Sequence, residues 1–194
     1  MTDKDLIQQL QQGKEQAFEY LVDHYQELVG NTCYGFVQNQ TEAEELAQDV
    51  FVEVFLSIKK FRGEAKLSTW LYRIAVNKGL NAVNKKKQKR RLQTVSTFFG
   101  FGEEKERDFA DDKQMGVLKQ MEAMETKKAL ERAIEKLPDK QRSAFVLRKY
   151  EELSYVEIAK VLETTVSSVE SLIHRASRNL RKYLEDFYYN YYQK

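Results

Sequence analysis

The feature that most constrains the fold is a helical repeat of apolar residues over residues 42–61, EAEELAQDVFVEVFLSIKKF. Its apolar side chains recur at the i, i+3, i+4 spacing that lines one face of an α-helix. They are Ala43, Leu46, Ala47, Val50, Phe51, Val54, Phe55 and Ile58. No segment alternates apolar and polar residues as a half-buried strand does, and the chain has only one proline and eight glycines. The sequence therefore predicts an all-α protein.

The N-terminal half reads as one helical domain over residues 1–92. Residues 5–12, 15–37 and 69–88 also have helical patterns. Thr41 followed by Glu44 has the spacing of a capping box, which predicts the start of the helix over 42–61.

A linker and a second helical domain follow. Residues 93–126 mix three closely spaced phenylalanines, glycines and dense charge without a consistent apolar face, which predicts a flexible linker. In residues 127–194, the only proline, Pro138, separates two helices. Ser154 with Glu157 and Ser167 with Glu170 predict capping boxes that open two further helices. Their short connection indicates a helix-turn-helix, and a plain helical hairpin with solvated charges is the alternative.

Charge is distributed very unevenly along the chain, although the net charge is only +2. Residues 1–56 carry 11 acidic and 2 basic residues, whereas residues 57–92 carry 12 basic residues and 1 acidic residue. A concentrated basic segment is typical of nucleic-acid binding, because neutralising phosphates releases counterions. A solvated basic helix end is the alternative.

Composition excludes several other classes of protein. No run approaches eighteen apolar residues, so we expect no membrane-spanning segment, and the N-terminus lacks the pattern of a secretion signal. The single cysteine, Cys33, suits a reducing cytoplasm and is expected in the core. The only histidines, His24 and His174, are far apart, and no nucleophile–base pair stands out. We therefore expect a cytoplasmic protein that is not an enzyme and has no metal or other cofactor.

The helix over 69–88 has two different faces. Leu71, Ile74 and Ala75 lie on the face expected to be buried, with Gly79 and Ala82. The opposite face carries Trp70, Arg73, Asn77, Asn81 and Asn84. Asparagine can read base edges, and an aromatic ring can stack on an exposed base. The face therefore suits single-stranded or opened DNA, and the alternative is a partly buried tryptophan among solvated asparagines.

Two long segments together resemble one known family. The first is AEELAQDVFVEVFLSIKKFRGEAKLSTWLYRIAVNKGLNAVNKKKQKR, and the second is LPDKQRSAFVLRKYEELSYVEIAKVLETTVSSVESLIHRASRNLRK. They resemble the extracytoplasmic-function (ECF) subgroup of bacterial sigma-70-type RNA polymerase sigma factors, over roughly residues 5–92 and 125–184. The resemblance implies a dissociable subunit that directs promoter-specific transcription initiation. The implied partners are the clamp and flap of the RNA polymerase core, promoter DNA and an anti-sigma factor.

The resemblance also implies a role for individual residues. Those implied to bind core polymerase are Leu46, Gln48, Asp49, Phe51, Val52 and Phe55. Those implied to capture flipped bases of the −10 element are Phe61, Arg62, Lys66, Leu67, Ser68, Thr69, Trp70, Arg73, Asn77, Asn81 and Asn84, with Asn77 matching the asparagine that borders the base pocket. Those implied to read the −35 element are Thr165, Ser167, Ser168, Glu170, Ser171, His174, Arg175 and Arg178.

The sequence departs from the family pattern at the start of the last helix. Two positions that are usually basic are Glu170 and Leu172. An acidic residue can accept a hydrogen bond from a cytosine amino group, which would alter −35 specificity. The favoured interpretation is instead that Glu170 caps the helix. The tail FYYNYYQK has no family counterpart and is expected to be a packed or frayed helix end.

Three other functions compete with the sigma-factor interpretation. A helix-turn-helix regulator would bind duplex promoter DNA without initiating transcription, and it leaves residues 61–77 without a role. A helical enzyme has no supporting cluster in the sequence. RNA binding by the basic helix is the third, because stacking on single strands does not distinguish the two sugars well.

Overall fold

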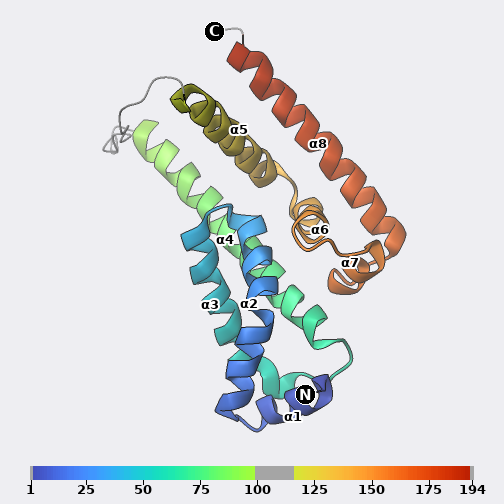
Figure 1. Ribbon diagram of the computed structural model, residues 1–194. Helices are drawn as coiled ribbons and strands as arrows, with labels where there is room; N and C mark the ends of the chain where they lie inside the picture. Colours follow the sequence, from blue (N-terminus) through green and yellow to red (C-terminus); the bar gives the residue numbers. More distant parts are fainter. Residues whose placement is uncertain (1, 99–115, 193–194) are drawn as a thin grey trace.

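The computed structural model describes residues 2–98 and 116–192, and every regular element in these ranges is a helix (Figure 1). The elements are α1 (Asp3–Gln11), α2 (Glu15–Val37), α3 (Gln40–Ser57), the short 3₁₀ helix η1 (Ile58–Lys60), α4 (Leu67–Phe98), α5 (Gly116–Lys136), α6 (Asp139–Lys149), α7 (Tyr155–Val161) and α8 (Val166–Tyr192). The all-α prediction is confirmed. None of the helices in the described ranges is long and apolar enough to cross a membrane.

Helices α1–α4 form the N-terminal bundle, in which α2, α3 and α4 lie side by side (Figure 1). Most of the apolar repeat of α3 faces inward, and Val50, Val54 and Ile58 are almost fully buried, whereas Phe55 of the same repeat is exposed. Leu71 and Ala75 of α4 are buried opposite them, as the two-faced pattern predicts. Gly79 is required by close packing, since a Cβ there would lie 2.5 Å from Cγ of Phe36. Cys33 is also buried in this core.

Helices α5–α8 form the C-terminal bundle, and α7 and α8 make the expected helix-turn-helix. The capping box that opens α7 is confirmed, because Ser154 accepts from the Glu157 N–H and Glu157 accepts from the Ser154 N–H. The long helix α8 runs beside α5 (Figure 1), and Ile134, Leu137 and Leu180 are buried between the two helices. The C-terminal tail continues α8 as far as Tyr192.

The two bundles pack against each other along α4 and α2 (Figure 1). A single buried cluster runs from Leu71 and Val76 of the N-terminal bundle to Leu147, Ile158 and Leu172 of the C-terminal bundle. Gly35 of α2 lies directly beneath α6, where an added Cβ would be 2.6 Å from Cγ1 of Val146. The described structure is therefore a closed form, which the sequence analysis did not predict.

Several predicted helix boundaries are wrong. Asn39 caps α3 by accepting from the Glu42 N–H, so Thr41 does not start that helix. Thr165 caps α8 by accepting from the Ser168 N–H at 3.2 Å, which removes the capping role expected for Ser167 and Glu170.

The predicted linker over 93–126 is helical at both ends. Helix α4 continues through residues 93–98, and α5 begins at Gly116. The middle of the predicted linker, residues 99–115 with three of its four phenylalanines, lies outside the described residues.

Candidate nucleic-acid interface

A small pocket lies where residues 61–66 lead into α4, and we call it the loop pocket. Its volume is about 260 Å³. The rings of Phe61 and Trp70 pack together with centroids 4.8 Å apart and planes inclined by 32°. Gln11 of α1 fixes the loop by donating from Nε2 to the Phe61 carbonyl at 2.9 Å. The lining residues are Ser57, Lys60, Phe61, Arg62, Glu64, Ala65, Trp70 and Arg73. The pocket combines aromatic surface for stacking with positive charge at its rim.

The polar face of α4 is already engaged by the C-terminal bundle. Arg73 donates from Nη2 to the Lys160 carbonyl at 2.7 Å, and its Nη1 lies 2.9 Å from Oε1 of Glu163. Further along α4, Asn84 donates from Nδ2 to Oδ2 of Asp139 at 3.1 Å. Two of the groups predicted to contact DNA, those of Arg73 and Asn84, thus pair with α6, α7 and the turn that follows α7.

Asn77 belongs to a different opening, which we call the interdomain pocket. It has a volume of about 320 Å³ and lies between α4 and the C-terminal bundle. Arg73 lines this pocket as well as the loop pocket, whereas Asn77 lines only the interdomain pocket. Asn81 is exposed further along α4. In the closed form, the predicted base pocket is therefore split between two cavities that share Arg73.

The remaining residues predicted to face the −10 element differ in exposure. Arg62 and Lys66 are exposed, and Ser68 and Thr69 are partly buried. Leu67 is completely buried and belongs to the core, so its side chain cannot contact a ligand in this conformation. Periodicity did not indicate this, because Leu67 begins α4 next to an irregular loop.

A buried carboxyl group lies at the contact between the bundles. Tyr72 of α4 donates from its hydroxyl group to Oε2 of Glu151 at 2.9 Å. The hydroxyl group of Thr32 on α2 donates instead to the Leu28 carbonyl at 2.8 Å, and Oε1 of Glu151 is buried without a hydrogen-bond partner. None of the ion pairs within the described ranges includes Glu151.

These surroundings perturb three titratable groups. Burial raises the pKa of Glu151 to about 7, and the nearby carboxylate of Glu27 adds to the increase. Burial also raises the pKa of Tyr72 and, to about 12, the pKa of Cys33, and the charge of Glu151 contributes in both cases. The neutral form of each group is therefore favoured in the closed form.

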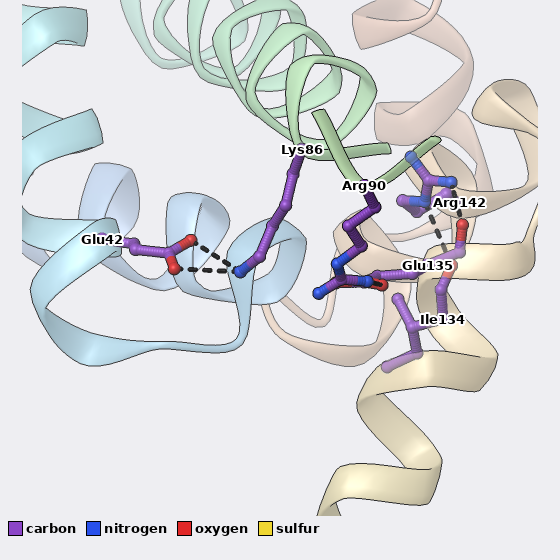
Figure 2. A network of polar contacts seen from close by, with 6 residues as sticks. All are labelled: Glu42, Lys86, Arg90, Ile134, Glu135 and Arg142. Atoms are coloured by element: carbon purple, nitrogen blue, oxygen red, sulfur yellow. Dashed lines mark hydrogen bonds and ion pairs between the residues drawn. The ribbon is translucent and has the colours of Figure 1, made fainter. Parts of the chain in front are cut away.

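A second polar network joins the bundles near the C-terminal end of α4 (Figure 2). Arg90 of α4 forms an ion pair with Glu135 of α5, and Lys86 pairs with Glu42 of α3 at 2.9 Å. Arg142 is completely buried beside them and donates to the carbonyl groups of Ile134, Glu135 and Leu137 at 2.6–3.1 Å. Its guanidinium group thus satisfies the last carbonyl groups of α5, which have no partner within that helix.

The predicted recognition helix, α8, presents one exposed stripe. The stripe follows the i, i+3, i+4 spacing and contains Ser167, Glu170, Ser171, His174, Arg175 and Arg178, and Val166 and Ser177 beside it are exposed as well. Val169, Leu172 and Ala176 are buried on the opposite side. Ser168 is partly buried and lines the interdomain pocket. Leu172, one of the two departures from the family pattern, packs into the common core of the closed form.

The outer face of α3 is apolar and exposed. Val52, Phe55 and Leu56 are 57%, 59% and 67% exposed, and Phe55 packs on Phe18 with ring centroids 4.9 Å apart. Of the other residues predicted to bind polymerase, Gln48 and Asp49 are exposed and Phe51 is partly buried. Leu46 is only 8% exposed and belongs to the core. The sequence analysis did not assign Leu56 to the polymerase-binding surface. A leucine outside the apolar repeat is expected on the outer face of the helix, so its place in the sequence could have indicated this role.

Two family models match the chain. Sigma-70 region 2 matches residues 21–89, and Sigma-70, region 4 matches residues 127–180. The chain is 35% identical over 185 residues to the ECF RNA polymerase sigma factor SigW of Bacillus subtilis, which covers 94% of this chain and 97% of the relative. It is 32% identical over 183 residues to the ECF RNA polymerase sigma-E factor of Escherichia coli (strain K12), with 91% of each chain covered.

Solved structures show the same fold. CnrH in complex with the cytosolic domain of CnrY aligns with a TM-score of 0.63 and 22% identity, covering 95% of this chain and 97% of that one. The sigma factor RpoE in complex with the anti-sigma factor NepR from Bartonella quintana aligns with a TM-score of 0.55 and 21% identity, covering 87% and 96%. From the two family models and the near full-length relatives, the chain belongs to the ECF RNA polymerase sigma factors.

Proposed function

We propose that this sigma factor uses three separate surfaces to direct promoter-specific initiation. The exposed apolar face of α3 binds the polymerase core. The exposed stripe of α8 reads the −35 element in the major groove, as recognition helices do. The loop pocket and the polar face of α4 hold bases of the opened −10 element. The chain acts by binding rather than by catalysis, and its partners are core polymerase, promoter DNA and an anti-sigma factor.

The observation that carries this proposal is the position of Arg73. Its guanidinium group borders the loop pocket and is bonded to Glu163 and to the Lys160 carbonyl of the C-terminal bundle. In the closed form Arg73 is therefore already bonded, and Asn77, although exposed, borders the interdomain pocket. Binding of the −10 bases then requires the C-terminal bundle to leave α4.

Separation of the bundles also agrees with the geometry of a promoter. Two recognition surfaces about one and a half DNA turns apart need a spacing of about 50 Å. Helices α4 and α7 are in direct contact in the closed form. A sigma factor that engages both elements at once must therefore be open, and binding to core polymerase is the step that supplies the necessary interactions.

Base capture has an energetic requirement that a free sigma factor cannot meet alone. Unstacking one base costs a few kcal/mol, and stacking on an aromatic side chain returns only ~1–3 kcal/mol. Contacts with polymerase are needed for the remainder. We therefore expect the isolated chain to bind duplex promoter DNA weakly, whereas a simple helix-turn-helix regulator would bind it tightly.

The test is run-off transcription with core polymerase and this chain on genomic fragments, combined with permanganate probing of opened thymines. Asn77→Ala is expected to retain core binding and reduce permanganate reactivity at the −10 region. Asn31→Ala is the matched control, because Asn31 is an exposed asparagine on α2 away from both pockets. Unchanged reactivity in Asn77→Ala would refute the pocket assignment. Absence of any promoter-specific transcript with folded, core-bound wild type would refute the proposed function.

A further inference from the structure

Glu170 stands in the middle of the exposed stripe of α8. It is exposed, as are Ser167 and Ser171 before and after it and His174 and Arg175 one turn further along. Glu170 also lines a shallow depression of about 710 Å³ together with Tyr155, Ser171, Ile173, His174 and Arg175. An acidic side chain therefore lies on the surface that the proposed function assigns to DNA.

Capping does not explain this residue. Helix α8 begins at Val166, and the hydroxyl oxygen of Thr165 accepts from the Ser168 N–H at 3.2 Å. Glu170 is in the second turn, where backbone N–H groups already bond within the helix. An N-terminal capping role is thus filled by Thr165 and is not available to Glu170.

An internal ion pair does not explain it either. Within the part of the chain that the structure describes, Glu170 forms no ion pair. Arg175, a cationic residue of the same stripe, donates from Nε to the Ser171 carbonyl at 3.1 Å. The Glu170 carboxylate is therefore available to a ligand that approaches this face.

The chemistry of the major groove limits what such a ligand can be. Phosphates repel a carboxylate, so Glu170 gains nothing from the DNA backbone. Guanine offers only acceptors in the major groove, thymine offers an acceptor and a methyl group, and adenine places an acceptor beside its donor. Cytosine alone offers an amino donor without an adjacent acceptor, and a carboxylate accepts from it.

We propose that Glu170 is a specificity-determining residue that selects a cytosine in the −35 element by accepting a hydrogen bond from its N4 amino group. This inference rests on the proposed function, because it assumes that the stripe of α8 faces the −35 element. It goes further in naming the base, the atom and the residue that discriminates.

The test uses the full chain with core polymerase and a promoter library randomised across the −35 element, read out by sequencing the transcripts. Wild type is expected to prefer cytosine on one strand at one position by about tenfold, the size of a single specific base contact. Glu170→Gln is expected to change that preference to adenine, because a glutamine amide pairs with N6 and N7 of adenine. Glu170→Ala is expected to lose discrimination at that position only.

Glu185→Gln is the matched control. It makes the same change of charge on an exposed residue of α8, about 22 Å further along the helix at 1.5 Å per residue. Its base preferences are expected to equal those of wild type. If Glu170→Gln transcribes normally and keeps the wild-type preference at every position, the inference about Glu170 is overturned and the proposed function stands. If wild type selects no promoter at all, the proposed function is refuted, and the inference about Glu170, which rests on it, is refuted with it.

Discussion

Replacing Glu151 by glutamine is expected to remove the pH dependence of packing between the two bundles. In the closed form, its carboxyl group is buried against Tyr72 of α4, and Oε1 has no hydrogen-bond partner. The groups that face it are Tyr72 from α4 and Glu27, Thr32 and Cys33 from α2, none of which is a cation. When the bundles separate, the carboxyl group returns to water and to its ordinary pKa.

The size and sign of the effect follow from the pKa in each form. The pKa of Glu151 is raised from 4.5 to about 7 by burial. The closed form therefore binds the proton more tightly than the open form does, and low pH favours closure. The advantage of the closed form is complete below pH 4.5 and is lost as pH rises through 7. A difference of this size changes the closed-to-open ratio by at most about 300-fold.

The assay is energy transfer between a dye on each bundle. Cysteines introduced at Glu19 of α2 and Ser177 of α8 are suitable, because both residues are exposed. The natural Cys33 does not interfere, since it is buried and its pKa is raised to about 12. Wild type is expected to lose energy transfer between pH 5 and pH 8, whereas Glu151→Gln is expected to stay closed across this range.

The matched control is Glu152→Gln, the same substitution at the next residue, which is exposed. Its pH profile is expected to follow that of wild type. If wild type and Glu151→Gln gave the same profile, the carboxyl group would not be the titrating group and the reasoning would be refuted. If low pH opened wild type instead of closing it, the sign would be wrong.

Three other substitutions test the packing and the polymerase surface. Gly35→Ala is expected to separate the bundles, because its Cβ would lie 2.6 Å from a side chain of α6. The control Gly30→Ala, on the same helix, meets nothing within 4 Å and should keep the energy transfer of wild type. Arg142→Met is expected to lower the free energy of unfolding by about 3 kcal/mol, since it leaves carbonyl groups at the end of α5 unpaired. The control Arg132→Met, at an exposed residue, should change the free energy of unfolding by less than about 0.5 kcal/mol in urea titrations. Phe55→Ala is expected to weaken core-polymerase binding about tenfold or more in a fluorescence titration, because its ring is 59% exposed. Loss of the contact with Phe18 is expected to cost only about 1 kcal/mol of stability, and unchanged affinity would contradict the assignment.

The helices and the inward-facing residues could largely be predicted from sequence. The repeat in α3 places Val50 and Val54 in the core, and the two-faced pattern of α4 separates Leu71 and Ala75 from Asn77 and the other asparagines. These predictions succeed because helical periodicity is local and each bundle buries one stripe per helix.

Helix starts were less predictable, because several residues near each start can cap. Thr41 and Ser167 each have a suitable acid three residues later, but Asn39 and Thr165 take the capping role. The choice depends on where the preceding turn ends, which a spacing rule does not contain.

Contacts between the bundles could not be predicted at all. Gly35, Tyr72 and Glu151 are far apart in sequence, and each has an ordinary local explanation. Arg142 similarly resembles a surface cation until the end of α5 is placed around it. Such residues become recognisable only when two elements meet, since burial is a property of the whole fold.

The arrangement of contacts along α4 has a kinetic consequence. Arg73, Asn84 and Arg90 each bond to the C-terminal bundle, and they are spread over about 25 Å of one helix at 1.5 Å per residue. Contacts in a row can be exchanged one after another for contacts with a partner, and each loss is then offset by a gain, so the barrier to separation is lower than the sum of the contacts. A promoter base or a polymerase surface that competes for Arg73 alone can begin to separate the bundles at the N-terminal end of α4. The two bundles can then come apart quickly even when the closed form is the more stable one.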